Sequence, residues 1–92
     1  IMIMPLDEFK FVKGQPQEFK RDDLENAVTR LFCNKCGTAI GTKSPTRPNS
    51  IILKVGTFDD PSIFIPAVAI FTKDKQNFHH IDDNIKAFEK RP

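Results

Sequence analysis

The chain contains two cysteines, Cys33 and Cys36, and their spacing is the clearest sign of chemistry in its 92 residues. Two intervening residues let the backbone turn so that both sulfur atoms face one point, as two ligands of a tetrahedral zinc ion must. Gly37 follows the second cysteine, where we expect a sharp turn with positive φ that glycine adopts at least cost. Structural zinc takes four protein ligands, so the pair is half of a metal site.

Two other interpretations of the cysteine pair stay open. A redox dithiol of the thioredoxin kind would stand at the start of a helix that follows a strand. Residues 37–41 instead have the composition of a turn that enters a short strand, which disfavours the redox hypothesis. The two residues can also be ordinary cysteines, buried or exposed, with no shared role.

Three further groups have residue types that can do chemistry. His79 and His80 could bind zinc or transfer protons, but neighbours on an extended segment point to opposite sides. We expect one to pack against the tail and the other to face solvent. Asp59 and Asp60 precede a proline, where a turn or a helix cap is favoured over paired acid-base carboxylates. Gly56 lacks a phosphate-loop motif, and we interpret it as a backbone requirement.

Composition narrows the class of protein. A chain of 92 residues with 39% hydrophobic content suffices for one domain with one core. The formal net charge of +2 and the scattered basic residues do not indicate nucleic-acid binding. No apolar run is long enough to span a membrane or to form the core of a signal peptide. We therefore expect a soluble, cytoplasmic protein with no membrane partner, and free thiols suit that reducing compartment.

Short alternating or apolar runs, separated by turn residues, predict strands over most of the chain. The expected strands are residues 1–4, 9–12, 17–21, 27–32, 38–42, 50–55 and 67–72, of which the last two should be buried. The fold class is therefore mainly β and antiparallel.

Several finer expectations follow from the same patterns. The strand over 17–21 should turn Phe19 inward, and the strand over 27–32 should end at Cys33. Residues 43–49 include two prolines and should form an exposed loop. Residues 84–91 have helical character, so the chain should end in a short helix or turn. The nine phenylalanines should lie mostly in the core.

Four motifs occur together in an order that is typical of one family. They are Phe-Cys-Asn-Lys-Cys-Gly-Thr at 32–38, Val-Gly-Thr-Phe-Asp-Asp-Pro-Ser at 55–62, the segment 70–78, and Ala-Phe-Glu at 87–89. The sequence resembles the family of the glutathione-dependent formaldehyde-activating enzyme and centromere protein V. This resemblance implies a β-tent fold, related to zinc ribbons, with a structural zinc held by four cysteines and a second, catalytic zinc. It assigns Cys33 and Cys36 to the structural zinc.

The sequence also departs from the family pattern. Full members carry a C-x-C pair and a C-x-C-x-x-C group upstream of the strand that begins here at Ile1, and the chain has neither. Ala69 and Phe78 stand where many members have histidine and tryptophan. We therefore expect residues 1–92 to form a single zinc-binding β domain that lacks its N-terminal cysteine-rich part. Because the catalytic zinc ligands are missing, we assign no catalytic residue and expect the chain as given to be inactive.

Two functional hypotheses remain. By resemblance, the intact protein is a zinc-dependent carbon-sulfur lyase-like enzyme that acts on a small thiol adduct such as S-hydroxymethylglutathione. The alternative is a non-catalytic, zinc-stabilised binding module. Either needs two ligands besides Cys33 and Cys36, from upstream residues or from a second copy, in a homodimer that shares zinc or strands. The start at Ile1, inside an expected strand and without an initiator methionine, predicts that the parent protein continues upstream.

Overall fold

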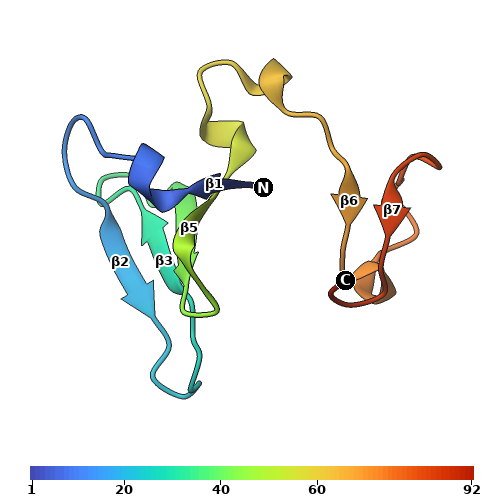
Figure 1. Cartoon of the computed structure of the whole chain (residues 1–92), viewed down its shortest axis with the longest axis horizontal. Coiled ribbons are helices and arrows are strands. Elements are labelled where there is room, and N and C mark those ends of the chain that lie inside the picture. The colour runs from blue at the N-terminus through green and yellow to red at the C-terminus, as the bar shows by residue number, and fades with distance from the viewer. The chain divides into compact units, whose positions relative to one another are not determined.

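The computed structural model describes residues 1–92 and divides them into two compact units, Ile1–Pro61 and Ser62–Pro92 (Figure 1). Strands form the regular structure of both units, and the only helical elements are 3-10 turns of three residues each. The mainly β, antiparallel fold class is therefore confirmed. The expectation of a single domain stays a prediction. The chain has no helix with the length and apolar character that a membrane span requires.

The first unit is built on a five-stranded antiparallel sheet. The strands are β1 (Met2–Pro5), β2 (Gln17–Lys20), β3 (Thr29–Phe32), β4 (Ala39–Ser44) and β5 (Arg47–Leu53), in the spatial order β1-β5-β4-β3-β2. Strands β2 to β5 follow one another as a meander, and β1 pairs with the far side of β5. Two 3-10 turns, η1 (Leu6–Glu8) and η2 (Val55–Thr57), flank β1 and β5 in the chain.

The core of this unit is small and lies on one face of the sheet. Leu31, Ile51 and Leu53 are 1%, 0% and 8% exposed, and they form one cluster from strands β3 and β5. Partly buried side chains around this cluster are Met4, Leu6, Phe9 and Phe58. Since Ile51 pairs with Met4 of β1, its position is central to both the sheet and the core.

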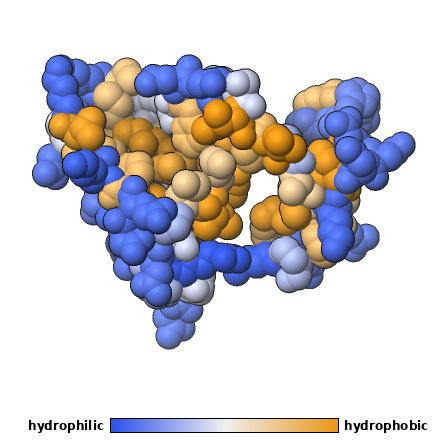
Figure 2. All heavy atoms as spheres, turned by 45° about the horizontal axis from the view of Figure 1, so that its top comes forward, coloured by the Kyte–Doolittle hydropathy of each residue, from blue (hydrophilic) through white to orange (hydrophobic).

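The expectation that the phenylalanines lie mostly in the core is wrong. None is buried, and Phe19, expected to point inward, is 51% exposed. The reason is that β2 is an edge strand whose four residues are all exposed, and no helix covers the sheet. Hydrophobic residues consequently remain visible at the surface of each unit (Figure 2).

Two strand boundaries in this unit differ from expectation. Residues 9–12 are not a strand, because the Phe9 amide donates to the Leu6 carbonyl (3.2 Å) and closes η1 instead of joining a ladder. Residues 43–49 are not a loop, because β4 and β5 continue into a hairpin in which Ser44 pairs with Arg47. The prolines are tolerated because one lies in the tight turn and the other in an irregular part of the β4–β5 ladder.

The second unit is short and held mainly by backbone hydrogen bonds. Its strands β6 (Val68–Ala69) and β7 (Lys86–Ala87) are parallel, and the 3-10 turn η4 (Thr72–Asp74) follows β6. The expected buried strand over 67–72 is therefore reduced to two residues, and Val68 is 50% exposed. Too few apolar side chains surround β6 to bury it.

The expected helix over residues 84–91 is absent, and the tail instead forms a turn and β7. The Ile85 amide donates to the Asp82 carbonyl (3.0 Å), which makes the turn. The Lys86 amide then donates to the Ala67 carbonyl (3.3 Å) and the Phe88 amide to the Ala69 carbonyl (2.9 Å). These amides are used in the ladder with β6, so they cannot form a helix.

Candidate metal centre

The two cysteines lie in the knuckle, residues 33–37, which connects β3 to β4. As expected, β3 delivers Cys33 at its end, and the chain then turns back into β4. The Cys33 amide donates to the Thr38 carbonyl (2.9 Å), and the Gly37 amide donates to the Cys33 carbonyl (2.8 Å). These two backbone hydrogen bonds close the turn and bring the two cysteines to the same side of the hairpin end.

Gly37 has the conformation that the spacing predicted. Its φ is +75°, in the left-handed region, and a Cβ added there would meet no atom within 4 Å. The requirement for glycine is therefore conformational rather than steric. The corresponding interpretation of Gly56 is wrong, because its φ lies outside the positive region and a Cβ there would also point into open space.

Hydrogen-bond donors surround both sulfur atoms. The Lys35 amide donates to Cys33 Sγ at 3.4 Å, and Thr38 Oγ1 lies 3.0 Å from Cys36 Sγ. The Thr38 hydroxyl lowers the pKa of the Cys36 thiol, helped by the Thr38 backbone and by the thiol of Cys33. Metal binding requires the thiolate, and these donors favour the thiolate form of Cys36. The role of Thr38 was missed, although it belongs to the same short motif.

The knuckle fits two of the four positions of a structural zinc site. Cys36 is exposed and Cys33 is half-buried, so both thiols are near the surface. Nowhere in the chain do three or more His, Cys, Asp or Glu residues gather into a group that could hold a metal. The residues present therefore fit half of a structural site, and they do not fit a second, catalytic zinc. Zinc binding by Cys33 and Cys36 stays a prediction.

The other candidates lie outside any such cluster. His79 and His80 are both exposed. His79 accepts a hydrogen bond at Nδ1 from the Gln76 amide (3.1 Å), and its ring lies 4.6 Å from the ring of Phe78 rather than against the tail. Exposed Asp59 and Asp60 lie between the 3-10 turns η2 and η3 (Pro61–Ile63), as the turn interpretation predicted.

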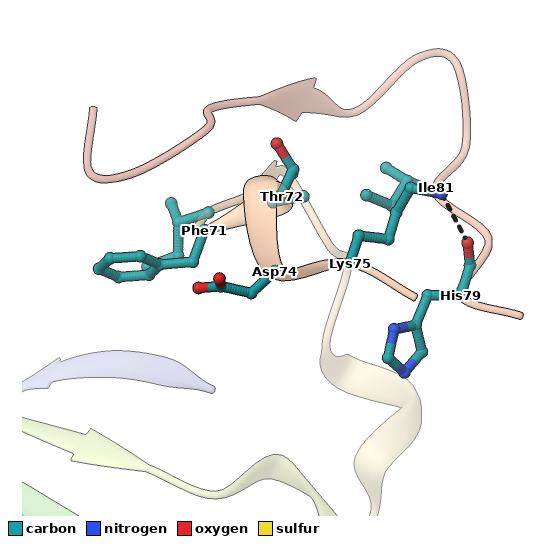
Figure 3. A pocket seen from close by; sticks show the side chains of 8 residues that line it. Phe71, Thr72, Asp74, Lys75, His79 and Ile81 are labelled. Atoms are coloured by element: carbon teal, nitrogen blue, oxygen red, sulfur yellow. Dashed lines mark hydrogen bonds between the residues drawn. The ribbon is translucent and has the colours of Figure 1, made fainter. Parts of the chain in front are cut away.

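The second unit has a shallow hollow that sequence analysis did not find (Figure 3). Its volume is about 270 Å³, and Phe71, Thr72, Lys75 and His79 are among the residues that line it. Phe71 has a φ of +55°, which is rare for an aromatic residue and has no signature in the sequence. Lys75 Nζ donates to the His79 carbonyl at 3.2 Å, so one of its hydrogen bonds is made within the unit.

Comparison with protein families agrees with the motifs. A family model described as glutathione-dependent formaldehyde-activating enzyme matches residues 1–74, which include the whole sheet of the first unit and both cysteines. Among curated proteins and solved structures, none matches the chain at a significant level. Since the family match covers most of the sequence, the chain belongs to the family of the glutathione-dependent formaldehyde-activating enzyme.

Proposed function

We propose that the intact protein is a zinc-dependent, carbon-sulfur lyase-like enzyme of the cytoplasm that acts on small glutathione or thiol adducts. Membership of the family supports an activity related to glutathione and the activation of formaldehyde. The observation that carries the zinc part of the proposal is the knuckle. There, Gly37 holds a positive φ, and two hydrogen-bond donors lie close to the sulfur atoms of Cys33 and Cys36.

In this proposal, the residues of the knuckle act as a structural clamp. Cys33 and Cys36 hold the ion, which supplies a cross-link at the end of the β3–β4 hairpin. The Thr38 hydroxyl favours the thiolate of Cys36, and the Lys35 amide donates to the sulfur of Cys33. The clamp fixes the end of a sheet whose buried cluster consists of only three side chains, where an added cross-link contributes most.

We derive no step of the lyase reaction from this chain, because its residues do not fit a second zinc site. The reaction would break the C–S bond of an S-hydroxymethyl thiol, with its hydroxyl becoming the carbonyl of formaldehyde and its proton returning to sulfur. The residues that do this belong to the intact protein. The same observation favours the second candidate function, a non-catalytic, zinc-stabilised binding module.

Formaldehyde exchange separates the two functions. The test incubates glutathione, ¹³C-labelled formaldehyde and zinc with this chain, and in parallel with the intact protein, and follows adduct formation by NMR. We expect the intact protein to accelerate exchange and this chain to match the protein-free control. No acceleration by the intact, zinc-loaded protein would favour the binding module. Zinc-dependent acceleration by this chain would show that the site assignment is wrong.

A further inference from the structure

The knuckle lacks two ligands and is open to a second molecule. Cys36 is exposed, as are its neighbours Asn34, Lys35 and Gly37, while Cys33 is half-buried. The knuckle stands where β3 ends and β4 begins, at one end of the sheet. A ligand pair at the end of a hairpin can approach an identical pair without a clash between the two sheets.

We propose that two copies of this chain share one zinc ion, and that each copy contributes Cys33 and Cys36. The inference rests on the zinc binding of the proposed function, and it adds the source of the two missing ligands. A two-fold axis through the ion makes the two thiol pairs equivalent, which is the usual symmetry of a homodimer. Four thiolates then complete the tetrahedral site that one chain leaves half filled.

The charge around the knuckle fits this arrangement. Residues 27–58 contain no aspartate or glutamate, and they contain five basic residues, all exposed: Arg30, Lys35, Lys43, Arg47 and Lys54. A zinc ion with four thiolates carries two net negative charges. The exposed Lys35 of each copy lies within the knuckle, so the pair of lysines balances that charge. Without the ion, two such basic surfaces repel each other.

The size of the contact makes the pairing depend on zinc. A stable interface between proteins buries about 1,200 Å² or more. The exposed residues of one knuckle, Asn34, Lys35, Cys36 and Gly37, supply only a small part of such an area. The shared ion must therefore provide most of the association free energy, and a chelator should separate the copies.

The test is a zinc titration of this chain, followed by light scattering and native mass spectrometry. We expect the mass to rise from 10.5 kDa to twice that value at one zinc per two chains, and to return after EDTA is added. Mixing ¹⁵N-labelled and unlabelled chains should give a mixed dimer with a single zinc. The wild-type titration needs no variant, so it is decisive even where a cysteine variant folds poorly.

Variants locate the contact. Cys36→Ser should stay monomeric with zinc, while its circular dichroism confirms the fold. Lys35→Glu places a negative charge beside the anionic centre and should weaken zinc-dependent pairing by about tenfold. Lys43→Glu makes the same charge change on β4, away from the knuckle, and serves as the matched control. Equal effects of the two lysine variants would contradict a contact at the knuckle.

The outcomes separate this inference from the proposed function. A monomer that holds one zinc through Cys33 and Cys36 would overturn the sharing and leave the zinc knuckle intact. A dimer that survives EDTA, or that forms equally well with Cys36→Ser, would overturn the sharing through a different interface. Absence of zinc binding by the folded wild-type chain would overturn both the sharing and the zinc part of the proposed function.

Discussion

Replacing Gly37 by alanine tests the conformation of the knuckle. The new Cβ meets no atom within 4 Å, so the strain of a positive φ is its only cost in the folded state. A residue with a side chain loses roughly 1–2 kcal/mol in the left-handed region. Alanine also restricts the unfolded chain, which stabilises the protein by about 0.4–1 kcal/mol. We expect a net loss of about 1 kcal/mol in unfolding free energy for Gly37→Ala.

The matched controls are two other glycines. Gly56 has no positive φ and open space at Cβ, so Gly56→Ala keeps only the gain and should stabilise by about 0.4–1 kcal/mol. Gly14 has a φ of +73° and open space, so Gly14→Ala should cost as much as Gly37→Ala. Two backbone hydrogen bonds hold the turn at Gly37. For this reason we expect the penalty in unfolding free energy, with zinc affinity changed by less than about tenfold.

Urea unfolding followed by far-ultraviolet circular dichroism is the suitable assay, since the chain has no Trp or Tyr for fluorescence. Zinc affinity is measured in parallel by competition with a chelating dye. If Gly37→Ala were as stable as Gly56→Ala, the left-handed turn would not be a requirement of the fold. If Gly37→Ala lost zinc affinity by much more than about tenfold while Gly14→Ala did not, the knuckle would form only with the metal.

Three further changes test the core, the hairpin and the thiol. Ile51→Ala should cost about 2–5 kcal/mol in urea unfolding, because the side chain is fully buried, whereas half-exposed Ile3→Ala should cost much less; equal losses would contradict the core assignment. Gly41→Ala should destabilise more than Gly37→Ala, because its Cβ would lie 2.5 Å from a backbone carbonyl of β5, and slow amide exchange between β4 and β5 should be lost. Thr38→Val removes the main cause of the lowered pKa of Cys36. The thiolate of folded Cys36 forms at lower pH than in the unfolded chain, so its stabilising contribution is present above the unfolded pKa and is lost as pH falls through the folded pKa. Thr38→Val should therefore shift the midpoint of Cys36 alkylation to higher pH, and an unshifted midpoint would contradict the role of the hydroxyl.

The elements around the cysteines were predictable because their signals are local. Alternation over residues 27–32 and the turn at Gly37 correctly placed a strand, a knuckle and a returning strand. The apolar run over 50–55 likewise predicted β5, which supplies the fully buried Ile51. In each case a short segment contained both its periodicity and its turn residue.

The rest depended on partners that composition does not reveal. Residues 43–49 looked like a loop, yet the pairing of Ser44 with Arg47 extends the hairpin through them. Phe19 looked like a core residue, but it lies on an edge strand with no cover. The left-handed conformation of Phe71 could not be predicted either, because no turn residue marks it.

The central claim, that Cys33 and Cys36 bind zinc, is tested most directly by X-ray absorption at the zinc edge of the zinc-loaded chain. The account predicts four sulfur neighbours at about 2.3 Å, two from each of two copies, and no such spectrum with Cys36→Ser. Two sulfurs with two lighter neighbours would retain the knuckle but contradict the shared site. A zinc ion surrounded only by nitrogen and oxygen would contradict the claim itself.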